Sequence, residues 1–169
     1  MERASGNFAL KAHLEDLNNM RKIIADITRS IRTLANSDEY RQSVRLLKTV
    51  PGISTLTAMI LLTELYNLSR FRNLDKLCSY VGLIPDTNSS GETEEKTGIT
   101  KRRNAQLRNI LIESAWVAVR KDPALIMTFN TLCKKMPKNN AIVRIARKLL
   151  NRIRHVLKNQ QEYVSAVVQ

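Results

Sequence analysis

A long series of apolar residues at steps of three and four constrains the N-terminal part of the chain most strongly. Charged and polar residues fill the intervals, and a period of about 3.5 residues predicts one long amphipathic helix. Arg21 and Thr28 fall where a strict coiled-coil seam would carry apolar side chains. The helix can therefore pair with a helix of another copy or pack on its own domain, and the sequence leaves both open. The apolar residues of this series are Leu10, Leu14, Leu17, Met20, Ile24, Ile27, Ile31 and Leu34.

The rest of the chain is also expected to be helical, so the predicted fold class is all-α. Only 5 Gly and 4 Pro occur in 169 residues, aromatic residues make up 5%, and no segment predicts a confident strand. We expect an amphipathic helix over 1–38, a helical domain over 39–160 and a tail over 161–169. Ser37 or Asp38 can cap the first helix of the domain through a side-chain oxygen. The expected helices of the domain cover about 39–48, 55–65, 73–81, 104–120, 123–134 and 141–159.

The positive charge of the chain is concentrated in its C-terminal part. The formal net charge is +13, and residues 101–169 carry 15 Lys and Arg against 3 Asp and Glu, whereas residues 1–100 carry 13 against 12. One-sided positive charge is typical of proteins that bind nucleic acids, although it can also be a solvated surface. We therefore expect a polyanionic partner.

The cysteines and acidic residues do not predict a metal site. Cys78 and Cys133 lie far apart with no Cys or His at zinc-ligand spacing, which favours a reduced, intracellular protein without zinc. The adjacent acids Glu92, Glu94 and Glu95 are expected to be solvated, so no metal ligand is assigned. No apolar run reaches the length that spans a bilayer, and no membrane partner is expected.

The segment around Pro51-Gly52 resembles a helix–hairpin–helix element. In such elements a Pro-Gly-Ile-Gly turn joins two helices, and main-chain N–H groups at the start of the second helix bind a DNA phosphate. Here Ser54 replaces the second glycine, and its hydroxyl can still donate a hydrogen bond. Gly52, Ser54 and Thr55 are thus candidate phosphate-binding residues, with an ordinary corner between helices as the other interpretation.

Two further groups of cations are candidates for nucleic-acid binding. Lys101, Arg102 and Arg103 directly precede a predicted helix that also carries Arg108. The last predicted helix carries cations on the side opposite its apolar residues, and Arg144, Arg147 and Lys148 are the candidates there. Both groups can hold backbone phosphates, and both can be merely solvated.

Ser90 lies in a polar, apparently mobile loop between about 85 and 98, directly before Gly91. A nucleophilic serine needs a base or metal and stabilisation of the transition-state charge. Neither His13 nor His155 is near it in sequence. Local chemistry alone therefore favours an ordinary turn.

The order of the motifs, more than any one of them, resembles a known family. The chain resembles the C-terminal domain of insertion-sequence transposases of the "one-ten" family, over about Leu46 to Leu157. Arg70, Phe71 and Asn104 match family positions to which we assign no role. The matching segments are Val50-Pro51-Gly52-Ile53, Ser69-Arg70-Phe71-Arg72, Tyr80-Val81-Gly82-Leu83-Ile84-Pro85, Ser90-Gly91, Gly98-Ile99-Thr100-Lys101, Asn104 and Leu107-Arg108.

The resemblance implies a recombinase that handles DNA and is guided by a bridge RNA. It implies that Ser90, with Ser89 as the other register, attacks a DNA phosphodiester. It also implies a RuvC-like domain whose acids bind a divalent metal, expected to be Mg²⁺, and a homo-oligomer formed through the N-terminal helix. That domain does not match this sequence, so we expect the chain to be part of a longer enzyme and inactive in cleavage alone. The alternative is a non-catalytic helix–hairpin–helix module of a repair or junction-processing protein.

Overall fold

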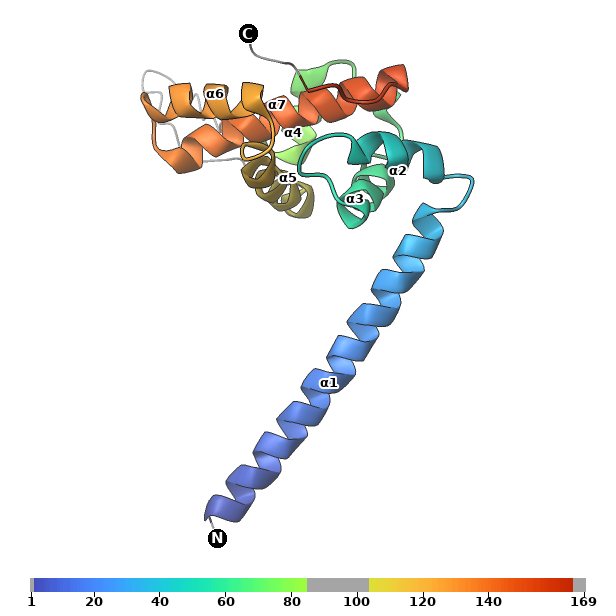
Figure 1. Ribbon diagram of the computed structural model, residues 1–169, viewed down its shortest axis with the longest axis vertical. Coiled ribbons are helices and arrows are strands. Elements are labelled where there is room, and N and C mark those ends of the chain that lie inside the picture. The colour runs from blue at the N-terminus through green and yellow to red at the C-terminus, as the bar shows by residue number, and fades with distance from the viewer. Residues whose placement is uncertain (1, 85–103, 166–169) are drawn as a thin grey trace, which may run out of the picture.

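The computed structural model describes residues 2–84 and 104–165, with side chains from Gly6 onward, and this part of the chain is all-α, as predicted (Figure 1). A long helix leads away from a body in which shorter helices pack around another long helix, one side of which is buried. The described elements are α1 (Glu2–Ala35), α2 (Arg41–Lys48), α3 (Thr55–Leu65), the 3-10 helix η1 (Leu68–Arg70), α4 (Leu74–Val81), α5 (Ala105–Ala118), α6 (Pro123–Cys133) and α7 (Lys138–Asn159).

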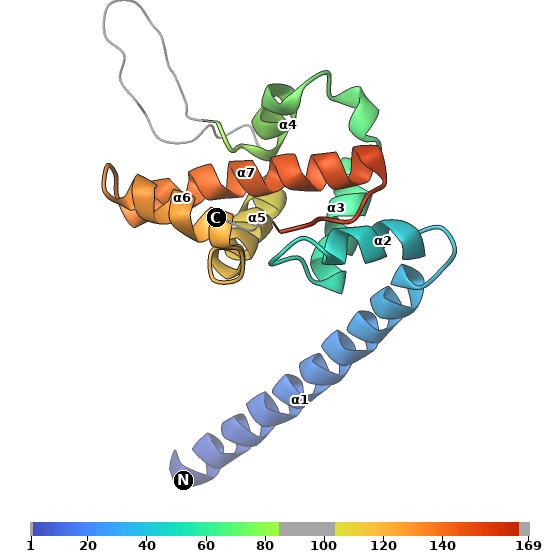
Figure 2. The same ribbon diagram turned by 45° about the horizontal axis from the view of Figure 1, so that its top comes forward.

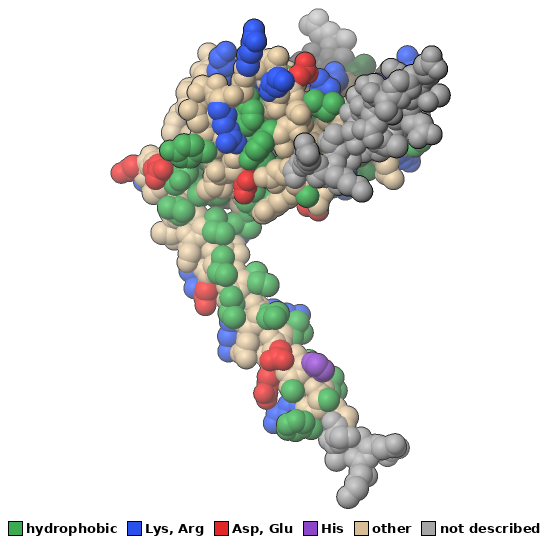
Figure 3. Space-filling view, turned by 180° about the vertical axis from the view of Figure 1, so that it is seen from behind, with side chains coloured by type: hydrophobic (Ala, Val, Ile, Leu, Met, Phe, Trp, Pro, Cys, Tyr) green, Lys and Arg blue, Asp and Glu red, His purple; other side chains and the backbone are tan. Residues whose placement is uncertain are grey.

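The helix α1 projects from the body and contacts it only near its C-terminal end (Figure 1). Ile31 and Ala35 pack against the core there, beside α3. The other large apolar side chains of α1 are 45% to 77% exposed and follow one side of the helix (Figure 3). The sequence left open whether this helix packs on its own domain or pairs with another copy. In the structure, the domain covers only the end of the helix.

The core of the body is built around α7, which contacts α2, α4, α5 and α6 (Figures 1 and 2). Ile145, Leu149 and Ile153 are fully buried on one side of α7, and Leu107 and Leu111 are fully buried on α5. The spacing of three and four between them is the helical period, so one stripe of each helix enters the core. Trp116 is partly buried and meets Phe129 edge to face with ring centroids 5.6 Å apart.

Side-chain caps fix the starts of four helices. Ser54 caps α3 by accepting the Thr57 N–H at 3.1 Å, and the same arrangement recurs at Asn73, Asn104 and Asp122. The predicted cap of α2 is wrong: Tyr40 holds the N-cap position without a side-chain hydrogen bond, because a tight turn through Ser37 precedes it. The last helix begins at Lys138, three residues before the predicted start, because Pro137 can precede a helix.

None of the helices in the described ranges combines the length and the apolar character that crossing a membrane requires.

Candidate nucleic-acid interface

The candidate residues fall in separate parts of the molecule. Ser90, Lys101, Arg102 and Arg103, together with Ser89 and the loop predicted around them, lie outside the described residues. The described candidates lie at the turn before α3, on α5 and on α7. They are Gly52, Ser54 and Thr55 at the turn, Arg108 on α5, and Arg144, Arg147 and Lys148 on α7.

The turn before α3 packs on α5 through Gly52. The φ angle of Gly52 is +88°, and a Cβ atom built there would lie 2.2 Å from the main-chain oxygen of Ser114. Only glycine accepts both this left-handed conformation and this contact. The glycine is therefore explained by close packing of two main chains inside the protein, and the helix–hairpin–helix interpretation must rest on the neighbouring residues.

The start of α3 offers hydrogen-bond donors on the surface. The Ser54 hydroxyl accepts the Thr57 N–H and lies 2.9 Å from the Thr57 hydroxyl, and the Ser54 side chain is exposed. The N–H groups of Thr55 and Leu56 precede the first intrahelical acceptors of an α-helix. This end of α3 thus has the polarity that favours an anion.

A second arrangement joins the two ends of the segment that carries Ser90. That segment leaves the described structure after Ile84 and returns at Asn104. The N–H of Asn104 donates to the carbonyl of Tyr80 at 3.2 Å, and its amide donates to the Glu64 carboxylate at 2.7 Å. Its Oδ1 atom accepts the Leu107 N–H and so begins α5. We call Glu64, Arg70, Phe71, Tyr80 and Asn104 the stem cluster.

Arg70 completes the stem cluster by stacking on two aromatic rings. Its guanidinium carbon lies 4.6 Å from the centroid of Phe71 and 4.7 Å from that of Tyr80, and one N–H donates to the Glu64 carbonyl at 3.1 Å. Phe71 is buried, and its ring centroid lies 5.3 Å from that of Tyr80. Stacked in this way, an arginine loses little freedom when it binds a further group.

The α7 candidates differ in exposure to solvent and in whether a carboxylate already pairs with them. Arg144 and Lys148 are exposed, whereas Arg147 makes an ion pair with Asp75 of α4. On α5, Arg108 is half-buried, has its Nε and Nη1 atoms shielded from solvent, and is engaged within the chain. Lys and Arg side chains gather on one face of the body (Figure 3). Arg144 and Lys148 are therefore the α7 candidates best placed to meet an external anion.

The predicted turn at Gly52 and the stem of the Ser90 segment lie at different ends of α3. Gly52 contacts the C-terminal half of α5, whereas Asn104 and Glu64 join the start of α5 to the end of α3. The 11 residues of α3 span roughly 16 Å at 1.5 Å per residue. Arg147 pairs with Asp75 of α4, the helix that also carries Tyr80 of the stem cluster. The turn before α3 and the stem of the Ser90 segment thus lie at opposite ends of α3.

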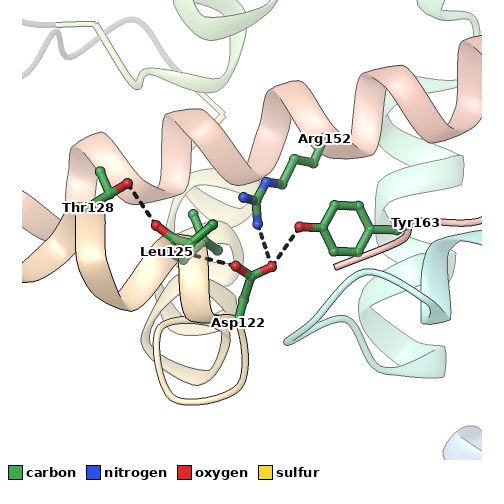
Figure 4. Close-up of polar contacts among 6 residues, drawn as sticks. Asp122, Leu125, Thr128, Arg152 and Tyr163 are labelled. Atoms are coloured by element: carbon green, nitrogen blue, oxygen red, sulfur yellow. Dashed lines mark hydrogen bonds and ion pairs between the residues drawn. The ribbon is translucent and has the colours of Figure 1, made fainter. Parts of the chain in front are cut away.

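A buried carboxylate holds α6, α7 and the C-terminal segment together (Figure 4). Asp122 is 1% exposed, caps α6 through the Leu125 N–H at 2.9 Å, pairs with Arg152 at 2.7 Å and accepts the Tyr163 hydroxyl at 2.6 Å. The guanidinium of Arg152 also lies 5.0 Å from the Tyr163 ring centroid. Sequence reasoning missed this cluster, and only Asp122-Pro123 signalled a helix start there.

The environment shifts both acidic groups of the cluster. Burial alone raises the pKa of Asp122, but the hydrogen bonds from Tyr163 and Leu125 and the charge of Arg152 outweigh it, so that its pKa lies below its usual value. Burial and the hydrogen bond to Asp122 raise the pKa of Tyr163 to about 12. The cluster therefore holds Asp122 ionised and Tyr163 protonated at neutral pH, as a structural clamp requires.

Among the described residues, no group of three or more His, Cys, Asp and Glu side chains could hold a metal ion.

The segment that forms most of this helical body has the sequence of a known class of protein, the transposases. Residues 44–129, about half of the chain, match the model of the Transposase IS116/IS110/IS902 family, and the chain belongs to this family. The resemblance identified from the motif order is thus confirmed.

Individual relatives agree with this assignment. The chain is 29% identical over 152 residues to a transposase for insertion sequence element IS1111A of Coxiella burnetii, covering 88% of this chain and 41% of the relative. It is 35% identical over 94 residues to a transposase for insertion sequence element IS1328 of Yersinia enterocolitica, covering 56% and 27%. It is also 28% identical over 120 residues to an uncharacterized insertion element IS110 protein of Streptomyces coelicolor, covering 70% and 30%. The chain thus spans less than half the length of each of these relatives.

Proposed function

We propose that this chain is the DNA-binding, serine-bearing part of a transposase. The observation that carries the proposal is the stem cluster, in which Asn104 joins both ends of the Ser90 segment to α3. Arg147 of α7 pairs with Asp75 of α4, the helix that also carries Tyr80 of the stem cluster. Fixed ends for the Ser90 segment and cations near them suit a nucleophile that must meet a DNA phosphate.

In the proposed reaction, the Ser90 hydroxyl releases its proton as Ser90 Oγ forms a bond to the scissile phosphorus, which balances the proton that the leaving oxygen takes up. The bond from that phosphorus to the 3′-oxygen of the neighbouring deoxyribose breaks, and this oxygen leaves with the electron pair and takes up a proton. The 5′ end of the cut strand is then held as a phosphoserine ester. The divalent metal and the guide RNA of this proposal rest on the family resemblance alone, and the described residues contribute no step through either.

A test of the nucleophile uses the chain joined to the RuvC-like domain of a full-length relative, with Mg²⁺ and target DNA. We expect a covalent protein–DNA adduct that resists denaturation, that Ser90→Ala abolishes and that Ser89→Ala preserves. The chain alone should form no adduct. Full strand exchange by Ser90→Ala would refute the nucleophile and favour the non-catalytic helix–hairpin–helix module.

Binding to duplex DNA tests the basic surface independently. Arg144→Ala with Lys148→Ala should weaken binding of the whole chain and lower the slope of log affinity against log salt by about 1.8, since each lost phosphate contact contributes about 0.9. Lys22→Ala, which removes an exposed cation from α1, is the matched control and should leave the slope unchanged. Affinity that does not vary with salt would exclude this mode of binding.

We also propose that α1 pairs with α1 of a second copy. Its support is the exposed apolar side of α1, which includes Leu14, Leu17 and Ile24 at 50%, 45% and 64% exposure. An exposed apolar stripe of this length at heptad-like spacing is typical of a coiled-coil partner. Sedimentation equilibrium should give a dimer that Leu14→Glu with Leu17→Glu converts to a monomer, while Lys11→Glu with Lys22→Glu, at exposed positions outside the apolar series, does not. A monomeric parent chain would refute the pairing.

A further inference from the structure

A basic hollow is lined by the C-terminal end of α3, by η1 and by the last turns of α7, at the end of α3 away from the turn at Gly52. Figure 2 shows how these helices are arranged. Its volume is about 550 Å³, within the 300–1,000 Å³ range of typical ligand sites. The apolar part of its wall is formed by Leu61, Leu62, Leu65, Phe71 and Leu157. None of the sequence candidates for DNA contact lines it.

The charged groups around the hollow have one sign. Arg72, Arg154 and Lys158 line it, and the described lining residues include no acid. Within the described part of the chain, none of these three cations makes an ion pair with a carboxylate, whereas Arg147 and Arg152 of α7 do. An apolar wall with cations at its edge suits a ligand that has a flat apolar part and a phosphate.

Tyr66 gives an independent indication of a ligand. It ends α3 at the edge of the hollow, its side chain is 90% exposed, and its φ angle is +46°. A non-glycine residue in this region of φ is uncommon and costs energy unless the surroundings require it. A large aromatic ring presented to solvent at the edge of a basic hollow is an available stacking surface.

We propose that this hollow binds one unstacked nucleotide of single-stranded DNA. The base lies on the apolar wall beside Tyr66, and the phosphate meets Arg72, Arg154 and Lys158. A duplex keeps its bases paired and stacked, so it cannot fill the wall in this way. The inference rests on the proposed DNA-handling function and adds a class of substrate to it, a separated strand.

A second hollow supports a strand over a free nucleotide. It has a volume of about 360 Å³, shares Arg154 and Lys158 with the first, and adds Arg152, His155 and Tyr163. The two hollows therefore adjoin along the last turns of α7. A strand whose base occupies the first hollow can place its next phosphate over the shared cations.

The experiment compares binding of the whole chain to a labelled thymidine oligomer of about 12 nucleotides and to a duplex of the same length. Tyr66→Ala should weaken single-strand binding about 5- to 100-fold, the effect of losing one base–aromatic stack, and leave duplex binding unchanged. Tyr66→Phe keeps the ring and should bind the single strand normally. Arg154→Ala with Lys158→Ala should lower the single-strand salt slope by about 1.4.

Arg144→Ala with Lys148→Ala separates this inference from the proposed function, because it should weaken duplex binding and spare the single strand. Failure of any form of the chain to bind duplex DNA would count against the proposed function. Duplex binding together with a single-strand affinity unaffected by Tyr66→Ala would refute the nucleotide site. A tenfold preference for the matching uridine oligomer of RNA would refute the assignment to DNA. With 4-thiothymidine in the oligomer, ultraviolet crosslinking should map to peptides containing Tyr66 or Leu157, and crosslinking elsewhere would also refute the site.

Discussion

Replacement of Asp122 by asparagine tests whether the buried carboxylate clamps the helical body. Asparagine keeps the shape and can still cap α6, so the change removes mainly the negative charge opposite Arg152. The Asp122 side chain is fully buried and that of Arg152 is only 22% exposed, so the variant leaves a cation largely shielded from water without its partner. Breaking a buried pair in this way costs about 3–5 kcal/mol, and we expect about 2–4 kcal/mol because Arg152 retains some contact with solvent and with the Tyr163 ring.

The measurement is urea unfolding followed by circular dichroism, supported by thermal unfolding, in which Tm should fall by roughly 5–15 °C. Asp75→Asn is the matched control, because Asp75 also pairs with an arginine of α7 but is 67% exposed. An exposed pair contributes about 0–1 kcal/mol, so this variant should unfold close to the parent chain.

The pKa of Asp122 lies below its unfolded value, so its contribution is present above the unfolded pKa of about 3.9 and is lost as pH falls through the folded pKa. The difference between parent chain and Asp122→Asn should therefore shrink in acid below about pH 4. Equal losses of stability in the Asp122 and Asp75 variants, or a difference that does not change in acid, would refute the clamp.

Three further substitutions have defined outcomes. Gly52→Ala should cost more than about 2 kcal/mol in urea unfolding, because it places a Cβ in the α5 main chain, whereas Gly6→Ala on α1, with nothing within 4 Å, should be neutral or stabilising. Asn104→Ala should lower the free energy of unfolding by about 1–3 kcal/mol, because it removes a helix cap and a hydrogen bond to a carboxylate. Asn73→Ala, which removes only a cap, should cost roughly 1 kcal/mol, and equal losses in the two variants would contradict the stem cluster. The pKa of Tyr163 is raised to about 12, so its contribution is present below pH 10 and lost as pH rises toward 12; Tyr163→Phe should lack this alkaline loss in unfolding curves.

The sequence predicted most of the helices because their signals are local. Ser54 caps α3 with a hydroxyl three residues from its donor, and the buried stripe of α7 follows the helical period. The predicted cap of α2 was wrong because two local structures compete there. Ser37 can cap a helix or take part in a tight turn, and the sequence does not decide between them. Local spacing and turn chemistry thus carry the fold class.

The stem cluster and the Asp122 clamp could not be predicted, because their contacts join distant residues. Asn104 and Glu64 are 40 positions apart, and Tyr163 and Asp122 are 41 apart. The helical period shows which side of a helix is buried, but it does not show which distant side chain a polar residue will contact. The roles proposed for Ser90, for the cations at 101–103 and for the α7 cations stay predictions. Ser90 and the cations at 101–103 lie outside the described residues.

The contact between Thr49 and Tyr163 has a consequence for how the protein is made. The Tyr163 N–H donates to the Thr49 hydroxyl across 114 positions, and Glu162 pairs with Arg45, so the segment around Tyr163 closes over α2. At a synthesis rate of about 5–20 residues per second, Tyr163 follows Thr49 out of the ribosome by roughly 6–23 s. During that interval the core-facing side chains of α2 and of the turn at Gly52 remain exposed to solvent. The body is thus expected to complete its packing after translation of the α7 region, and the earliest helices are the part of the nascent chain most open to wrong association.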